Sequence, residues 1–295
     1  MLDGFERLRI ETSEAEIALV RGGTGPPVLL LHGYPQTHAM WHRVAPILAE
    51  RFTVVCADLR GYGDSSKPPD GVGHEGYCKR ATARDQVEVM ETLGFSRFAL
   101  VGHDRGARVA HRLAFDQPER VTRLALLDIV PTWEVFRATN AELATATYHW
   151  FFLIQPDGLP ERLIGADPEY FLRECLRRWS AGEDAFFDPR AVAEYVRCFS
   201  DATTIHSSCE DYRAGASIDL VHDEADLGRT VDVPLLVLWG AKGKLNTLFD
   251  VLAVWGERFP DARGKALPAG HFLPEELPEE TAAELLAFLG ESRAG

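Results

Sequence analysis

The chain has few of the features that mark secreted, membrane-spanning or metal-dependent proteins. Its 295 residues include only five cysteines, which are dispersed and form no C-x-x-C pair. An odd, scattered set is typical of reduced thiols, so we expect a cytoplasmic protein. No apolar run approaches the roughly 18 residues that suggest a membrane span, and the first ten residues mix charges into their apolar positions, unlike a signal peptide. HExxH, Walker and EF-hand patterns are absent from the sequence.

Positive charge is also scarce. Lysine and arginine number 31 against 45 acidic residues, which gives a formal net charge of −14. This excess argues against nucleic acid and anionic membranes as main partners, because both bind basic surfaces. Taken alone, it disfavours a small anionic substrate and predicts that added salt speeds the capture of one. The hydrophobic content of 46% and the length are typical of a globular chain with a substantial core.

Short apolar runs alternate with helical patterns along most of the chain. A hairpin is predicted over Leu8–Glu11 and Glu16–Arg21. Apolar runs that suit strands buried on both faces follow at Pro27–His32, Phe52–Ala57, Phe98–Gly102, Val121–Leu127 and Pro234–Trp239. Helical patterns cover Met40–Glu50, Cys78–Leu93, Arg105–Phe115 and Glu279–Leu289. The alternation predicts an α/β fold, with a mostly parallel sheet and helices on both faces.

A helical insert interrupts this alternation after the sixth predicted strand. From Pro131 to about Arg229 the chain is helical and rich in aromatic residues, and the strand pattern resumes at Val231. We therefore divide the chain into the first part of a core (1–130), a helical cap (131–229) and the second part of the core (230–295). An insert at the carboxyl end of a strand lies over the ligand side of the sheet.

The segment Gly102-His-Asp-Arg-Gly106 lies between a predicted strand and a predicted helix. Glycines two positions before and after Asp104 permit a strained turn that exposes this residue above the sheet. Many hydrolases have a serine here, which needs a base to become a nucleophile, whereas a carboxylate is already ionised at neutral pH. Attack by a carboxylate on a saturated carbon gives an alkyl ester that water can hydrolyse. Asp104 therefore indicates displacement of a halide or opening of an epoxide.

Hydrolysis of such an ester needs a base and an acid that orients it, in the chain order nucleophile, acid, base. His271 follows the last predicted strand, where the base is expected. Asp128 and Asp250 compete for the acid; we favour Asp128, because it directly ends a buried apolar run, where an unpaired carboxylate is costly. The backbone N–H groups of Tyr34, in a His-Gly-Tyr-Pro segment, and of Arg105 are predicted to hold an oxyanion.

The order of these motifs resembles the α/β-hydrolase superfamily, on its dehalogenase and epoxide-hydrolase branch. Within this branch, four segments closely resemble fluoroacetate dehalogenases: His103–Arg108, Tyr148–Trp150, Cys209–Gly215 and Gly270–Glu275. The resemblance spans essentially the whole chain. It implies an α/β-hydrolase fold with Asp104 as nucleophile, His271 as base and Asp128 as orienting acid, without a metal or organic cofactor, and it suggests a homodimer.

The resemblance also implies the contacts of a small anionic haloacid substrate. Arg105 and Arg108 would bind its carboxylate, and His149, Trp150 and Tyr212 would surround its halide. The two arginines are three positions apart in the first turn of a helix, so they share a face at an end that favours anions. A neutral haloalkane would gain nothing from two guanidinium groups beside the nucleophile. We therefore expect a short 2-haloacid, with fluoroacetate foremost and glycolate as its product.

Other interpretations stay open on the sequence alone. An epoxide hydrolase shares the nucleophile, the base and the fold, and Tyr148 and Tyr212 could protonate the opening oxygen. A non-catalytic binding protein on the same fold fits less well with an intact nucleophile, acid and base. Aromatic residues in a helical cap are usually packing residues, and for Trp179 we expect packing alone.

Overall fold

The computed structural model describes residues 1–180 and 186–291. Its central sheet, within these ranges, consists of β1 (Glu6–Glu11), β2 (Glu16–Gly22), β3 (Pro27–Leu31), β4 (Thr53–Ala57), β5 (Phe98–His103), β6 (Val121–Leu127), β7 (Leu235–Gly240) and β8 (Arg263–Leu267). The strand order is β1-β2-β4-β3-β5-β6-β7-β8. β2 pairs antiparallel with β1 and β4, and the other neighbours are parallel.

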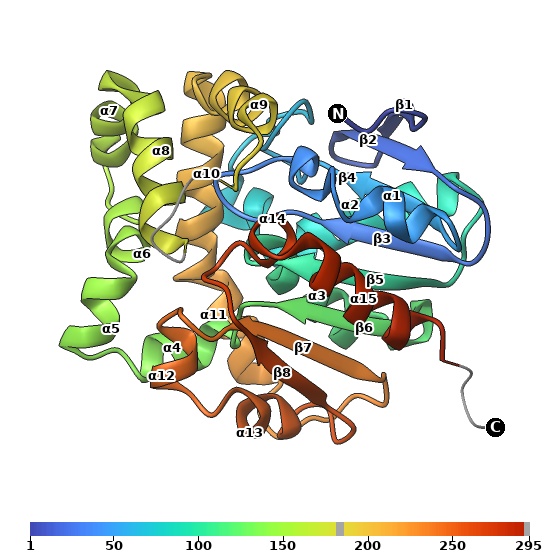
Figure 1. Ribbon diagram of the computed structural model, residues 1–295. Helices are drawn as coiled ribbons and strands as arrows, with labels where there is room; N and C mark the ends of the chain where they lie inside the picture. The colour runs from blue at the N-terminus through green and yellow to red at the C-terminus, as the bar shows by residue number, and fades with distance from the viewer. Residues whose placement is uncertain (181–185, 292–295) are drawn as a thin grey trace.

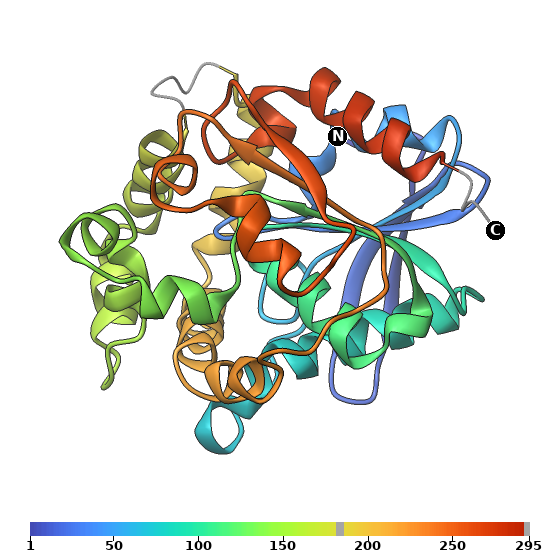
Figure 2. The ribbon, with the colours of Figure 1, turned by 90° about the horizontal axis from the view of Figure 1, so that it is seen from below.

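Helices cover both faces of the sheet (Figure 1). One face carries α1 (Ala45–Ala49) and α15 (Pro278–Leu289), and the other carries α2 (Lys79–Thr92) and α3 (Arg105–Asp116), as Figure 2 shows. The central strands β4 and β5 are buried along their whole length, as apolar strands covered on both sides must be. The predicted α/β class with a mostly parallel sheet is confirmed.

The helices between β6 and β7 gather beyond the carboxyl ends of the parallel strands (Figure 1). They are α4 (Thr132–Arg137), α5 (Ala141–Ala146), α6 (Tyr148–Leu153), α7 (Leu159–Ala166), α8 (Pro168–Trp179), α9 (Pro189–Phe199), α10 (Ala202–Gly215) and α11 (Ile218–Ala225). We call this insert the cap. Its exact bounds stay a proposal, and residues 181–185 and 292–295 of the predicted division lie outside the described residues.

Shorter elements complete the described chain: the 3-10 helices η1 (His38–Trp41), η2 (Val72–Tyr77) and η3 (Pro118–Arg120), and the helices α12 (Leu245–Leu248), α13 (Val251–Gly256) and α14 (Leu273–Glu276). None of the described helices is long and apolar enough to cross a lipid bilayer. All five cysteines are buried and free.

One prediction about local structure is wrong, and one strand was not predicted. The single helix predicted over Met40–Glu50 is interrupted after η1, and Pro46, which cannot donate a helical hydrogen bond, lies in the first turn of the separate helix α1. The edge strand β8 was not predicted, because its half-exposed residues show no apolar run. A Cβ atom at Gly264 would lie 1.8 Å from the carbonyl oxygen of Val237, so the glycine permits the close approach of β8 to β7.

Candidate active site

Asp104 lies in a strained turn between β5 and α3. Its φ and ψ angles are 45° and −114°, a combination that L-residues rarely adopt. The turn is also tightly packed: a Cβ atom at Gly102 would lie 2.5 Å from the carbonyl oxygen of Gly106, and one at Gly106 would lie 2.4 Å from that of His32. The two flanking glycines therefore allow the turn, and the turn places the Asp104 side chain at the carboxyl edge of the sheet.

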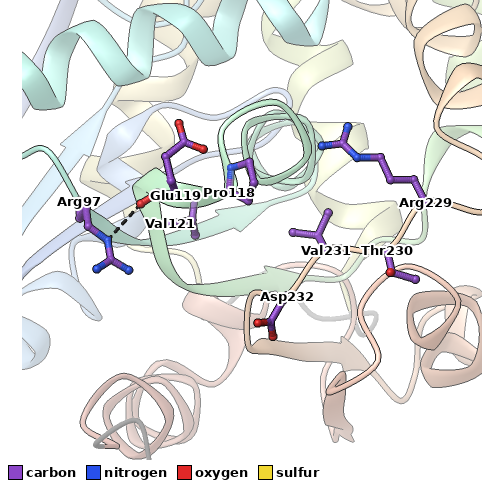
Figure 3. Close-up of a pocket in the computed structure, with 8 residues that line it drawn as sticks. All are labelled: Arg97, Pro118, Glu119, Val121, Arg229, Thr230, Val231 and Asp232. Atoms are coloured by element: carbon purple, nitrogen blue, oxygen red, sulfur yellow. Dashed lines mark hydrogen bonds between the residues drawn. The ribbon is translucent and has the colours of Figure 1, made fainter. Parts of the chain in front are cut away.

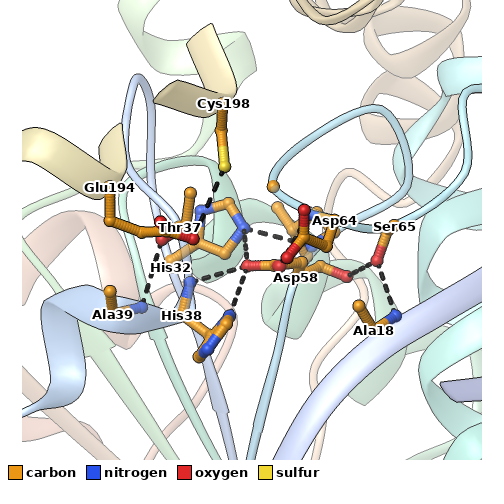
Figure 4. Close-up of polar contacts among 12 residues, drawn as sticks. Ala18, His32, Thr37, His38, Ala39, Asp58, Asp64, Ser65, Glu194 and Cys198 are labelled. Atoms are coloured by element: carbon orange, nitrogen blue, oxygen red, sulfur yellow. Dashed lines mark hydrogen bonds and ion pairs between the residues drawn. The ribbon is translucent and has the colours of Figure 1, made fainter. Parts of the chain in front are cut away.

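A backbone N–H group orients the Asp104 carboxylate. The N–H of Tyr34 donates a 3.0 Å hydrogen bond to Oδ2 of Asp104. The loop that carries Tyr34 is anchored to Asp58, whose Oδ1 accepts hydrogen bonds from the backbone N–H of His38 (2.7 Å) and pairs with its Nδ1 (2.9 Å), as Figure 4 shows. The Tyr34 hydrogen bond fixes Oδ2 of Asp104 and leaves its other carboxylate oxygen, Oδ1, without this donor. The second predicted donor, the N–H of Arg105, belongs to the adjacent peptide at the start of α3.

His271 and Asp128 lie together, although 143 residues separate them in the chain. Nδ1 of His271 is 2.6 Å from Oδ2 of Asp128, and Oδ1 of Asp128 accepts a 2.8 Å hydrogen bond from the N–H of Gly240. Asp250, the alternative acid, instead caps α13 by accepting a hydrogen bond from the N–H of Ala253. The structure therefore brings Asp128 to the imidazole and leaves Asp250 on another element.

The charges of the site set the protonation of its members. Burial alone raises the pKa of Asp104, but the positive charge of His271 and of the two arginines outweighs burial and lowers the pKa overall. Burial lowers the pKa of His271, whereas its hydrogen bond to Asp128 and the charges of Asp128 and Asp104 raise it above the ordinary value. Asp104 is therefore ionised at neutral pH, and the Asp104 charge makes His271 more basic.

Arg105 and Arg108 both lie near the nucleophile, but different partners hold them. The Nε of Arg105 donates to Oδ2 of Asp211 (2.6 Å), and its Nη2 donates to the Asp211 carbonyl oxygen (2.7 Å). Nη1 of Arg108 donates to the carbonyl oxygen of Val130 (3.0 Å) and to Oγ1 of Thr132 (2.9 Å). Among the described residues, the buried Nε of Arg108 has no hydrogen-bond acceptor. Each guanidinium is thus fixed at one side and has hydrogen-bonding capacity left for an anion.

The three predicted halide residues are buried and cluster above Asp104. The ring centroid of Tyr212 lies 5.8 Å from that of His149 and 6.1 Å from that of Trp150. Burial lowers the pKa of His149 to about 3, and burial together with the Asp104 charge raises the pKa of Tyr212 well above its ordinary value. At neutral pH the imidazole and the phenol are therefore both uncharged and can donate hydrogen bonds.

A cavity of about 450 Å³ connects this cluster with the surface. Asp104, Arg108 and His271 line its inner part together with His149 and Trp150. Arg105 and Tyr212 do not line it; they pack on each other, with the guanidinium carbon 4.2 Å from the phenol centroid. Three cationic residues also belong to the lining: Arg178, Lys242 and Lys244.

A second pocket is far from this chemistry. It lies beside the amino end of β6, between η3 and the segment that follows the cap, and Arg97 and Arg229 are among its lining residues (Figure 3). Ligand sites of parallel α/β sheets lie at the carboxyl ends of the strands, so we do not assign a function to it.

Sequence reasoning missed two residues of the site. Trp179, for which only packing was expected, lines the cavity; its ring centroid is 4.3 Å from that of His149, and its carbonyl oxygen accepts a hydrogen bond from the N–H of His271. Asp211, which holds Arg105, was not assigned a role. Asp211 lies next to Tyr212 in the Cys209–Gly215 segment, so an acidic residue beside a predicted halide contact was the available signal.

Comparisons with known proteins agree with this geometry. A sequence model of the α/β hydrolase fold family matches residues 26–278. The chain is 49% identical over 295 residues to a fluoroacetate dehalogenase from Burkholderia sp, covering 100% of this chain and 97% of that protein. The chain belongs to the α/β-hydrolase superfamily and to its haloacetate dehalogenase family. The family membership predicted from the motif order is therefore confirmed.

Other relatives of this α/β hydrolase include epoxide hydrolases. A soluble epoxide hydrolase from Corynebacterium sp. (strain C12) is 34% identical, with 93% of each chain covered. A crystal structure described as an α/β hydrolase from Nostoc sp PCC 7120 superposes with a TM-score of 0.98 at 59% identity, covering 99% of this chain and 100% of that one. A Pseudomonas aeruginosa protein described as an epoxide hydrolase mutant with bound MFA has a TM-score of 0.92 at 48% identity, covering 98% and 97%.

Proposed function

We propose that this haloacetate dehalogenase family member hydrolyses short 2-haloacids, with fluoroacetate as the principal substrate and glycolate and fluoride as products. The observation that carries the proposal is the pairing of a carboxylate nucleophile with two arginines in the next turn, beneath a buried cluster of uncharged donors. The 49% identity over the full chain to a protein named fluoroacetate dehalogenase supports the same substrate class.

In the first proposed step, Oδ1 of Asp104 attacks the carbon that carries the halogen. The carbon–halogen bond breaks, the halide leaves with the bonding electrons, and an ester links Asp104 to the substrate. Arg105 and Arg108 would hold the substrate carboxylate so that this carbon lies in line with the attacking oxygen. His149, Trp150 and Tyr212 would donate hydrogen bonds to the departing halide, which in a dry cavity stabilises its developing charge.

In the second step, His271 removes a proton from a water molecule that attacks the carbonyl carbon of the Asp104 ester. The backbone N–H groups of Tyr34 and Arg105 would stabilise the resulting oxyanion. On collapse, the bond between Asp104 and the substrate oxygen breaks, and His271 returns its proton to that oxygen, which leaves as glycolate. Asp104 keeps the oxygen from water and loses its hydroxyl proton, so the carboxylate is regenerated. Ester formation removes the negative charge of Asp104, which is one cause of the raised pKa of His271. The imidazole therefore loses basicity as the ester forms, so its unprotonated form is more populated when the base is required.

The second candidate function is epoxide hydrolysis. It is favoured by Tyr212 near the nucleophile and by Tyr148 in the cavity lining, since two phenols can protonate an opening epoxide. Arg105 and Arg108 argue against it, because a neutral epoxide has no negative charge for two guanidinium groups to bind.

The direct test is to incubate the purified protein with fluoroacetate, chloroacetate and styrene oxide in parallel. A fluoride electrode, chloride analysis and diol detection follow the three products. We expect fluoride release to exceed the other two reactions. Diol formation with no halide release would establish the epoxide hydrolase instead, and tight binding without any turnover would establish a binding protein.

The protein's location and assembly are further proposals. Five buried, free thiols are consistent with a reducing compartment, so we propose the cytoplasm. A homodimer is proposed from the family resemblance. Sedimentation equilibrium of the purified chain tests the dimer, and fractionation of the source cells tests the location.

A further inference from the structure

A second cluster of ionisable side chains joins the cap to the core, outside the cavity. The loop after β4 contributes Asp70 and His74, and α10 of the cap contributes His206 and Glu210. Nε2 of His206 lies 3.0 and 3.1 Å from the two carboxylate oxygens of Asp70. Nδ1 of His74 lies 2.6 Å from Oε2 of Glu210. One potential ligand atom from each of Asp70, His206 and Glu210 lies within 4.8 Å of the others.

We propose that Asp70, His206 and Glu210 bind a divalent transition-metal ion such as Zn²⁺. His206 and Glu210 are four positions apart on α10, so their side chains project from one face of the helix. Imidazole nitrogen and carboxylate oxygen are ligands that zinc accepts, and three such donors leave the fourth tetrahedral position to a water molecule.

The surroundings of His206 provide a second observation in favour of a metal. Its other ring nitrogen, Nδ1, lies 3.2 Å from Oε1 of Glu161 on α7. A carboxylate on the far nitrogen is the usual partner of a metal-binding histidine, because it fixes the ring and leaves Nε2 free to bind the ion. Arg213 in turn donates to both oxygens of Glu161, at 2.6 and 3.1 Å. The contact of Glu161 with Nδ1 therefore orients the His206 ring so that Nε2 faces Asp70.

The cluster is also open to an ion from solvent. The side chains of Asp70 and His206 are each 44% exposed, and that of His74 is 38% exposed. Glu210 is buried, and Arg213 donates to its Oε1 at 2.8 Å, which directs Oε2 toward His74. Three carboxylates and one guanidinium surround two imidazoles, so the site has a net charge of about −2 when both histidines are neutral, which a divalent cation would neutralise.

A bound ion would tie α10 to the core. Glu210 immediately precedes Asp211 on α10, so this helix carries two of the proposed metal ligands, His206 and Glu210, and also the residue that holds Arg105. The proposal nevertheless does not depend on the dehalogenase reaction, because the ion would stabilise the cap without taking part in chemistry. Metal binding favours the folded state by mass action, so zinc should raise the melting temperature of the protein.

The experiment is a calorimetric titration of the metal-stripped, full-length protein with Zn²⁺. We expect one saturable site whose affinity falls between neutral and mildly acidic pH, because histidine must lose its proton to bind. His206→Asn should weaken binding at least tenfold, and Glu161→Gln should weaken it by roughly 10- to 100-fold. The matched control is His222→Asn, a cap histidine on α11 outside the cluster, which should leave the affinity unchanged.

Two results would overturn the proposal. One is the absence of a saturable zinc site in the wild-type protein. The other is equal zinc affinity in wild type, His206→Asn and Glu161→Gln, which would show adventitious binding elsewhere. If His206→Asn fails to fold, Glu161→Gln and the pH dependence of the wild-type protein still decide the question.

Discussion

Nδ1 of His271 lies 2.6 Å from Oδ2 of Asp128, and this contact joins the end of β6 to the loop after β8. The contact fixes the imidazole and raises its pKa above the ordinary value, against the effect of burial. A protonated His271 cannot act as a base, so hydrolysis of the ester should be slow at low pH and should accelerate as the imidazole loses its proton.

Replacing Asp128 should change both the rate and its pH dependence. In Asp128→Asn, the charge and hydrogen bond that raise the pKa of His271 are lost, and burial, which lowers it, remains. The acidic limb of the kcat profile should therefore move to lower pH, while kcat falls by roughly 10³- to 10⁴-fold because the ring is no longer held in its working tautomer. Fluoride release between pH 5 and 9 measures both effects.

The control for this variant is Asp250→Asn. Asp250 caps α13 and does not touch His271, and asparagine caps a helix about as well as aspartate, so this replacement should change stability little and leave the pH profile in place. An unshifted limb in Asp128→Asn, or a shifted one in Asp250→Asn, would contradict the assignment of the acid.

Asp211 is predicted to position Arg105. It accepts two hydrogen bonds from that guanidinium and also contacts Lys79 and Tyr62. Asp211→Asn should therefore raise KM for fluoroacetate more than it lowers kcat, since the arginine loses its orientation. It should also destabilise the protein by about 3–5 kcal/mol, because buried cations lose their partner.

Burial raises the pKa of Asp211, but the charges and hydrogen bonds of Arg105 and Lys79 together outweigh burial and lower the pKa overall. Its contribution to stability should therefore be present at neutral pH and be lost as the pH falls below the carboxyl's ordinary range. The matched variant is Asp219→Asn, which contacts Lys79 but not Arg105. A raised KM in Asp219→Asn equal to that in Asp211→Asn would show a general effect of destabilisation, against a specific positioning role.

The phenol of Tyr212 should matter most for fluoride. Fluoride is a poor leaving group and a strong hydrogen-bond acceptor, so Tyr212→Phe should slow fluoroacetate turnover by about 10- to 100-fold and affect chloroacetate less. Tyr148→Phe is the comparison, because Tyr148 lines the cavity, whereas Tyr212 does not, and is 39% exposed. Equal losses for both acids in Tyr212→Phe would contradict a fluoride-specific donor, and loss of styrene oxide opening in both variants would favour the epoxide hydrolase.

The cationic lining of the cavity bears on how salt affects the enzyme. The net charge of −14 alone predicts that salt speeds capture of an anion. Arg178, Lys242 and Lys244 line the cavity, and charges within one Debye length, about 8 Å in physiological salt, dominate a small ligand's path. We therefore expect kcat/KM for fluoroacetate to fall with added salt.

Charge variants identify the source of this effect. Lys242→Gln should reduce kcat/KM at low salt and flatten its salt dependence. Lys265→Gln removes the same charge from β8, where Lys265 pairs with Glu284 outside the cavity lining, and should change neither. A rate that rises with salt in the wild-type protein would show that the overall charge prevails over the local one.

Much of the fold and of the central site could be predicted, because it depends on local patterns. The apolar runs that form β3 to β7, and the glycines around Asp104, can each be recognised from a few consecutive residues. Residues whose role depends on a partner far away in the sequence could not be predicted in this way. Trp179 becomes part of the cavity only because the end of α8 packs on His149 and His271.

The edge strand β8 is the second feature that the sequence patterns did not predict. β8 has half-exposed residues and a glycine that is needed only because another backbone lies against it. No periodic pattern in that segment could have revealed the strand. The sequence favoured Asp128 over Asp250, because Asp128 directly ends a buried apolar run, and the structure brings the same residue to His271.

The central claim is that Asp104 forms a covalent ester, and one turnover in heavy-oxygen water tests it most directly. The enzyme is used in excess over fluoroacetate, and both glycolate and the peptide that contains Asp104 are analysed by mass spectrometry. The account predicts unlabelled oxygen in the first glycolate and one heavy oxygen in the Asp104 carboxylate, because water attacks the ester carbonyl. First-turnover glycolate labelled fully from solvent, with Asp104 unlabelled, would contradict it.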